Sequence, residues 1–152
     1  MTSVPPLAEG YEISTDPGRL DVTRVHHWLS TDAYWALGRD LEKQERAVAA
    51  SLNFGVYDTA SGAQVAYARV VTDHATFAWL CDVYVAPSVR GKGLGTAMVA
   101  AVRDRLRADG VPRVLLATQD AHGVYRKIGF EPLEFPDRWM ALIFAKLADS
   151  VS

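Results

Sequence analysis

The chain has 152 residues, of which 49% are hydrophobic and 22% are charged, and its formal net charge at pH 7 is −2. This length is enough for one domain with its own hydrophobic core, and the composition is ordinary for a globular protein. A charge so near zero gives no general attraction to nucleic acid, and no apolar run approaches the roughly 20 residues of a membrane-spanning helix. We therefore expect a single domain over residues 1–152, with residues 1–10 as a loose lead-in, and neither nucleic acid nor a membrane as a partner.

The chain contains one cysteine, Cys81, so an intrachain disulfide framework is excluded. A protein without disulfides fits a reducing compartment. The first residues also lack the basic segment followed by an apolar one that a secretion signal would show. We expect a cytoplasmic protein. No set of His, Cys, Asp and Glu residues has the spacing of metal ligands, so no metal is expected.

The first half of the chain predicts a strand, two helices and three further strands. Residues 11–15 alternate apolar and polar side chains, as a short edge strand does. Residues 21–30 have helical spacing with Asp21 as the N-cap, and residues 40–52 predict a second helix. The next strands are expected at residues 54–57, 64–71 and 76–85. The last of these is almost continuously apolar, aromatic or β-branched, which predicts a central strand buried on both faces.

The second half predicts a long helix followed by shorter elements. Apolar residues recur at every fourth position from Leu94 to Leu106, which marks one face of a helix, and Gly110 and Pro112 end that helix. The remaining elements are a strand, one or two helical turns and two closing strands, expected at residues 114–118, 123–128, 130–132 and 140–144. This order predicts an α+β domain around one mixed sheet.

A glycine-rich basic turn joins the central strand to the long helix. Gly91, Gly93 and Gly95 alternate with Lys92 and Leu94, directly after Arg90. A backbone without side chains at alternate positions can bend sharply and let a ligand approach its N–H groups. These groups lie at a helix N-terminus, where unpaired donors and the helix dipole favour an anion. The turn therefore predicts a ligand that carries phosphate.

Two common phosphate-binding motifs do not fit this turn. A nucleoside-triphosphate P-loop needs a glycine where Ala86 stands, and Ser or Thr where Gly93 stands. A dinucleotide fingerprint that begins at Gly91 needs its last glycine at Thr96. The P-loop interpretation therefore fails, and the dinucleotide interpretation is weak.

The segment Arg90-Gly91-Lys92-Gly93-Leu94-Gly95 resembles the Arg/Gln-x-x-Gly-x-Gly motif of the GNAT acetyltransferase superfamily. Val83-Tyr84-Val85-x-Pro87 precedes it at the usual interval, and Tyr125-x-x-x-Gly129-Phe130 is similar to a second element of the family. The resemblance implies a three-layer α+β fold, in which helices flank a mixed, mostly antiparallel central sheet that is splayed at its fourth strand. It also implies acetyl-CoA as a co-substrate.

The family pattern implies how acetyl-CoA would be held. Backbone groups of Val83, Tyr84 and Val85 would pair with the pantetheine arm like an extra strand. Backbone N–H groups of the turn would bind the pyrophosphate, and the residues concerned are Gly91, Lys92, Gly93, Leu94, Gly95 and Thr96. Arg90 and Lys92 would add positive charge, or else belong to a solvated turn. Thr118 stands where the family often has asparagine, so the coenzyme contacts of its loop stay open.

Two residues are candidates for the chemistry. The resemblance implies that Tyr125 protonates the leaving thiolate as a general acid; the alternative is a tyrosine that packs the short helix. Asp82 is an acid in an otherwise apolar central strand, where an unpaired carboxylate is costly. It is the candidate base, with two alternatives: a structural Asp82 paired with Arg69 or a loop N–H, and a base formed by a water chain.

The resemblance implies that the first two helices and the loop between them form the acceptor side. That region holds His27, Trp28, Tyr34 and Trp35, which would form a pocket for an apolar or cationic acceptor or else plug the core. His122 would line the site or relay a proton, or else cap the short helix.

The predicted function is N-acetylation of a small primary amine by direct attack in a ternary complex. Direct attack is favoured because Cys81 and Ser88 lack an identifiable histidine partner. Protein N-termini or lysines are the second class of acceptor, and an idle acyl-CoA sensor on the same fold is the rival from another class. The resemblance also allows a homodimer.

Overall fold

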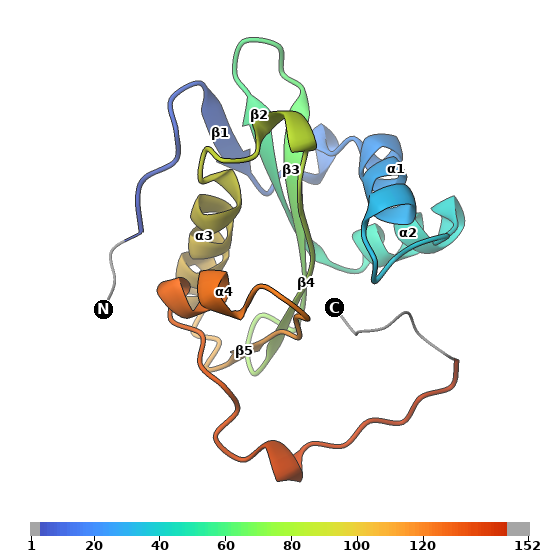
Figure 1. Cartoon of the computed structure of the whole chain (residues 1–152), viewed down its shortest axis with the longest axis vertical. Helices are drawn as coiled ribbons and strands as arrows, with labels where there is room; N and C mark the ends of the chain where they lie inside the picture. The colour runs from blue at the N-terminus through green and yellow to red at the C-terminus, as the bar shows by residue number, and fades with distance from the viewer. Residues whose placement is uncertain (1–3, 146–152) are drawn as a thin grey trace.

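The computed structural model describes residues 4–145, which form one five-stranded sheet with helices on both faces (Figure 1). The strands lie in the order β1-β2-β3-β4-β5. Their bounds are β1 Tyr11–Ser14, β2 Leu52–Asp58, β3 Gln64–Thr72, β4 Ala78–Val85 and β5 Val114–Leu115. The helices are α1 Val22–Asp32 and α2 Leu41–Ala49 on one face, with α3 Leu94–Ala108 and α4 His122–Ile128 on the other. Short 3-10 turns lie at Pro17–Arg19, Pro87–Val89 and Pro136–Arg138.

Both N-terminal helices begin where the sequence predicts, because each has an aspartate cap. The carboxylate of Asp21 accepts from the backbone N–H of Arg24 at 3.0 Å, and that of Asp40 accepts from Lys43 at 2.7 Å. The predicted end of the second helix is wrong, since α2 stops at Ala49 and Leu52 begins β2. Leu52 continues the helical spacing in the sequence but contributes its apolar side chain to the sheet.

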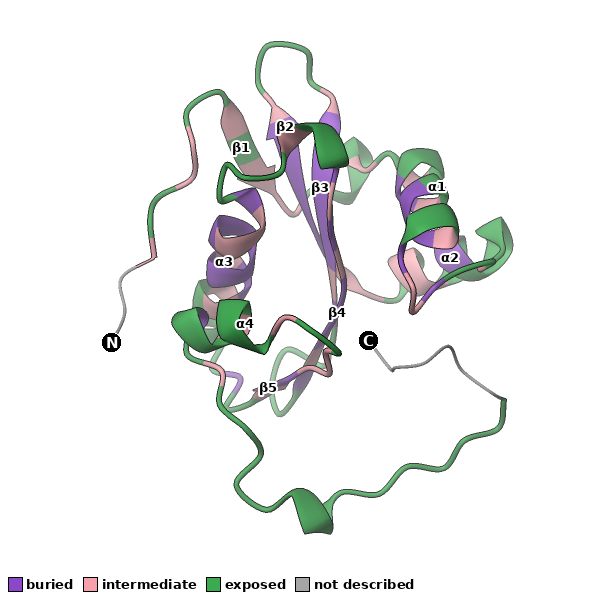
Figure 2. Ribbon diagram, viewed as in Figure 1, coloured by how far each residue is buried: buried purple, intermediate pink, exposed green. Residues whose placement is uncertain are grey.

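The core has one half on each face of the sheet. The apolar stripe of α3 is buried against β2, β3 and β4, as the four-residue spacing predicts, and Met98 is fully buried there. On the other face α1 places Val25, Trp28 and Leu29 against Tyr67 and Tyr84. The burial colouring shows both halves as purple against the sheet (Figure 2).

The sheet opens at β4. Strands β1 to β4 are antiparallel neighbours, whereas β4 pairs with β5 in parallel and only at Ala78↔Val114 and Trp79↔Leu115. Beyond Trp79 one edge of β4 therefore has no strand partner in the described chain. This confirms the expected α+β fold with a mixed, mostly antiparallel sheet that is splayed at its fourth strand.

The predicted closing strands are wrong for this structure. Neither residues 130–132 nor residues 140–144 form a strand within the described range 4–145, and β5 covers only the first part of residues 114–118. The segment 133–144 leaves the body as an exposed arm (Figure 2). Met140 is 97% exposed and Phe144 92%, so their strand-like apolar pattern has nothing to pack against.

None of the helices in the described range is long and apolar enough to cross a bilayer.

Gly55 in β2 offers a test of the packing beside it. An added Cβ would lie 2.5 Å from the hydroxyl oxygen of Tyr57, and Tyr57 is 1% exposed and unable to swing out. We expect Gly55→Ala to lower the free energy of unfolding by about 1–3 kcal/mol, measured by urea denaturation.

Gly123→Ala in α4 is the matched control, because nothing lies within 4 Å of its added Cβ. It should leave the free energy of unfolding unchanged or raise it, since alanine favours a helix more than glycine does. Equal midpoints for Gly55→Ala and wild type would contradict the packing described here.

Candidate functional site

The glycine turn is built to leave backbone donors free. Gly91 has φ of 85° and Gly93 has φ of 75°, in the left-handed region that favours glycine. Gly93 is the N-cap of α3, no side chain caps this helix, and the first helical bond runs from the N–H of Ala97 to the carbonyl of Gly93. The N–H groups of the preceding first turn can therefore bind an anion.

A groove of about 400 Å³ lies over this turn, between β4, the start of α3 and α4. Eight of the ten predicted coenzyme residues line it, namely Val83, Val85, Arg90, Gly91, Gly93, Leu94, Gly95 and Thr96. Gly95 lets α3 approach β4 closely, because a Cβ there would lie 3.2 Å from a methyl carbon of Val85. The groove is thus bounded by bare backbone at one end and by the open edge of β4 along its length.

The cations of the turn have partners within the chain. Arg90 donates from Nε to the carbonyl of Val85 at 2.9 Å, and its guanidinium lies 5.3 Å from the ring centre of Tyr84. Half of its side chain remains exposed, and it lines the groove. Lys92 donates from Nζ to the hydroxyl of Tyr11 at 3.1 Å and does not line the groove.

Tyr84 also lies outside the groove, because its side chain points to the opposite face of the sheet. Its hydroxyl donates to Asp32 at 2.6 Å and its ring stacks on Trp28 at 5.4 Å. Only its backbone is left for the predicted pairing with pantetheine.

A second cavity, of about 180 Å³, adjoins the groove. It lies among the loop after α1, the open half of β4 and the loop between β5 and α4. Its lining residues are Tyr34, Trp35, Leu80, Cys81, Asp82, Val83, Leu116, Ala117, Thr118, Asp120, Ala121 and Tyr125. Val83, Ala121 and Tyr125 line both cavities, so the two cavities adjoin at these three residues.

Tyr125 stands at this junction in its protonated form. Burial, followed by the neighbouring Tyr34 and Asp120, raises the pKa of Tyr125 to about 12. Its ring packs edge-on against Phe130, with ring centres 5.8 Å apart. A hydroxyl held in this way can give a proton to a group beside it.

The carboxylate of Asp82 is fully buried and fully paired. It accepts from Trp35 Nε1 at 2.9 Å, from Arg39 Nη1 at 2.8 Å and from Arg69 Nε at 2.9 Å. Burial alone would raise the pKa of Asp82, but hydrogen bonds and charges from Arg39 and Arg69 outweigh it and hold this pKa below its usual value. This environment favours the structural alternative, an Asp82 paired with Arg69, over a carboxylate waiting for a proton.

The predicted acceptor residues fall into separate places. Tyr34 and Trp35 lie together in the second cavity, with ring centres 4.9 Å apart. His27 is exposed on α1, and Trp28 is buried against Tyr84; neither lines a cavity described here. Tyr34 and Trp35 therefore form a cavity wall, whereas Trp28 fills the core.

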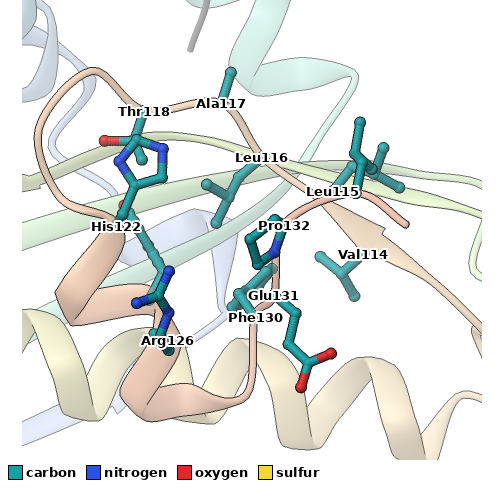
Figure 3. Close-up of a pocket in the computed structure, with 12 residues that line it drawn as sticks. Val114, Leu115, Leu116, Ala117, Thr118, His122, Arg126, Phe130, Glu131 and Pro132 are labelled. Atoms are coloured by element: carbon teal, nitrogen blue, oxygen red, sulfur yellow. The ribbon is translucent and has the colours of Figure 1, made fainter. Parts of the chain in front are cut away.

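His122 lies in a third cavity, of about 440 Å³, beside β5 (Figure 3). Residues 114–118 form one wall, residues 130–133 form the other, and His122 and Arg126 of α4 lie at one end. Tyr125 lines this cavity as well as the other two.

Sequence reasoning missed two residues of this region. Arg39 binds Asp82 from a loop 43 residues earlier in the chain, and no local pattern marks that partnership. Asp120 lines the second cavity from an exposed position beside Tyr125. Its place two residues before His122 was the only available signal.

The sequence matches the acetyltransferase (GNAT) family model over residues 22–130. An acetyltransferase homologue from Gibberella zeae is 32% identical over 136 residues, which cover 77% of this chain and 76% of that protein. Serotonin N-acetyltransferase 2, chloroplastic, from Oryza sativa subsp. japonica is 38% identical over 127 residues; these cover 81% of this chain but only 62% of the rice protein.

A solved GNAT-family structure from Xanthomonas campestris pv. campestris superimposes with a TM-score of 0.83 at 41% identity, covering 93% of this chain and 95% of that one. The family resemblance inferred from the two motifs is therefore confirmed, together with its fold. The chain belongs to the GNAT family of acetyl-CoA-dependent acetyltransferases.

Proposed function

We propose that this protein transfers the acetyl group of acetyl-CoA to the primary amine of a small apolar or aromatic molecule in the cytoplasm. Both substrates are bound when the amine attacks. The observation that supports this most is the sharing of Val83, Ala121 and Tyr125 by the coenzyme groove and the second cavity. Two ligands that meet at one general acid need no covalent enzyme intermediate.

The coenzyme groove suits acetyl-CoA along its whole length. In our proposal the free N–H groups between Gly91 and Thr96 bind the pyrophosphate, with Arg90 adding charge and Lys92 contributing from the rim. The open edge of β4 at Val83, Tyr84 and Val85 pairs with the pantetheine arm through its backbone. The thioester then lies beside Tyr125.

Each step of the transfer has a group in the chain. The amine nitrogen forms a bond to the thioester carbon, and the carbon–sulfur bond breaks. The backbone N–H of Val83 faces the carbonyl oxygen as that oxygen gains negative charge. Tyr125 gives its proton to the departing sulfur and takes one back from solvent before the next turnover. The proton lost by the amine passes to water at the open end of the cavity, where Asp120 lies exposed, because the carboxylate of Asp82 is already occupied.

The wall of the second cavity favours a small aromatic or apolar amine. Tyr34 and Trp35 supply flat apolar surface, and Asp120 supplies a negative charge for an ammonium group on its approach. The relative from rice is named for serotonin, an amine with an aromatic ring. A volume of about 180 Å³ suits such a molecule better than a protein N-terminus or lysine, which is the less favoured acceptor.

Tyr125→Phe tests the general acid. This change keeps the ring that packs on Phe130 and removes only the hydroxyl. We expect kcat on the best amine of a panel to fall about 10²- to 10⁴-fold, measured by release of CoA thiol at saturating acetyl-CoA. Thermal stabilisation by acetyl-CoA should be unchanged.

Lys127→Ala, at an exposed position on the same helix that lines none of the three cavities, is the control that should keep most of the activity. Unchanged turnover in Tyr125→Phe would remove Tyr125 from the mechanism. Absence of any amine-dependent thiol release from the wild type would favour the acyl-CoA sensor instead.

The pH dependence follows from the raised pKa of Tyr125. Because this pKa is about 12, the hydroxyl keeps its proton throughout the alkaline range in which ordinary amines lose theirs. We expect kcat to rise with pH and then level off, with no fall up to about pH 10. A decline well below that pH, in protein that remains folded by circular dichroism, would mean that a more acidic group donates the proton.

We further propose that the protein is a homodimer held by exchanged C-terminal arms. The cavity beside β5 lies between residues 114–118 and residues 130–133, while residues 140–144 of the same chain are apolar and exposed. The arm curves round the body without joining the sheet (Figure 1). An arm from a second copy, laid along residues 114–118, would pair with the free edge of β5 and cover both apolar surfaces at once.

The double variant Leu142→Glu with Phe144→Glu tests this exchange, because the exchanged arm would then bury two negative charges in the cavity beside β5. We expect wild type to sediment as a dimer at micromolar concentrations and the double variant as a monomer, in analytical ultracentrifugation. Leu41→Glu, at a 40% exposed position on α2, is the matched control and should remain dimeric. A monomeric wild type would contradict the exchange.

A further inference from the structure

The backbone of β4 has a bulge at Asp82. Tyr67 of β3 faces Tyr84 and Arg69 faces Cys81, so the single residue between them on β3 opposes both Asp82 and Val83. Asp82 has φ of 52°, a value that residues other than glycine rarely adopt. A bulge of this kind bends the strand and leaves one residue out of the pairing ladder. The residue that follows the bend, Val83, is one of the three that line both cavities.

The side chain of Asp82 connects this bulge to the acceptor loop. Its carboxylate receives bonds from Trp35 and Arg39, both in the loop between α1 and α2, and from Arg69 on the neighbouring strand. Trp35 forms part of the wall of the second cavity. One carboxylate therefore connects a wall of the second cavity to the strand bulge that precedes Val83.

The loop side of this connection is itself anchored. Arg39 donates to the amide oxygen of Gln44 at 3.0 Å, and the carbonyl of Arg39 lies 2.7 Å from His26 Nε2. Gln44 is fully buried in α2. A shift of the carboxylate would therefore be transmitted to Trp35 rather than absorbed by a mobile arginine.

We propose that Asp82 is a positioning residue: it holds the β4 bulge and Trp35 in one fixed relation, so that the acceptor amine meets the acetyl carbon at Val83. This inference rests on the proposed function. It assigns Asp82 no proton transfer. Its effect is on the distance and angle between the two substrates, where a displacement of about 1 Å can cost about 100-fold in rate.

Asp82→Asn is the test. Asparagine also tolerates positive φ and keeps an oxygen for Trp35, but it loses the charge that holds two arginines. We expect kcat to fall about 10- to 100-fold and KM for the amine to rise, while KM for acetyl-CoA stays within about twofold. The acidic limb of the pH–kcat profile should keep its midpoint, because Asp82 takes no proton.

Two other outcomes would overturn the inference. Loss of the acidic limb, with KM for the amine unchanged, would make Asp82 the general base. Unchanged kcat and KM with a lower melting temperature would make its role purely structural. Asp82→Gly separates backbone from side chain, since glycine accepts the bulge without strain. Its kcat should be as low as that of Asp82→Asn or lower; full activity in the glycine variant would also refute the positioning role.

A second measurement keeps this test separate from the proposed function. Acrylamide quenching of tryptophan fluorescence, compared between Asp82→Asn and Asp82→Asn with Trp35→Phe, reports the exposure of Trp35 without any turnover. The same comparison between wild type and Trp35→Phe gives the quenching of Trp35 in the unchanged protein. We expect the quenching of Trp35 to be greater in Asp82→Asn than in wild type. Equal quenching of Trp35 in the two proteins would refute the inference even if the enzyme acetylates amines. If the wild type acetylates none of the amines tested but the quenching difference is present, only the proposed acceptor class is refuted.

Discussion

The separation of β4 from β5 after two residue pairs is the constraint on which the site depends. Strand β4 pairs with β3 along its length except at the bulge, yet its other edge has no strand partner in the described chain beyond Trp79. Backbone donors and acceptors away from water need partners, so an open edge in the middle of a sheet is a place that a ligand can complete. Both cavities of the site lie along this edge, and Val83 belongs to each of them.

The glycine turn and the groove over it could be predicted from the sequence because their parts are neighbours in the chain. The strand, the glycine turn and the first turn of α3 follow one another, and the positive φ angles at Gly91 and Gly93 are local consequences of residue type. The apolar stripe of α3 depends only on helical periodicity, and Asp21 and Asp40 act within one turn. In each case the physical cause acts within a few residues of its effect.

The surroundings of Asp82 and the second cavity could not be predicted in the same way. Asp82 is bound by residues 13, 43 and 47 positions away in the chain, so its burial and low pKa depend on how three elements meet. Trp28 and Trp35 look alike in the sequence, yet one stacks on Tyr84 in the core and the other lines a cavity. Residues 140–144 have the pattern of a strand, but a pattern cannot supply the partner that makes a strand.

The ion pairs of Asp82 are better explained by geometry than by stability. Removing a carboxylate and two guanidinium groups from water costs several kcal/mol for each ion, and apolar residues of similar volume often stabilise a protein as much or more. Asp82 also occupies a backbone conformation that costs about 1–3 kcal/mol for a residue other than glycine. A chain selected only for stability could dispense with both features. What they supply together is a fixed relation among β3, the β4 bulge and the loop that carries Trp35, which forms part of the wall of the second cavity.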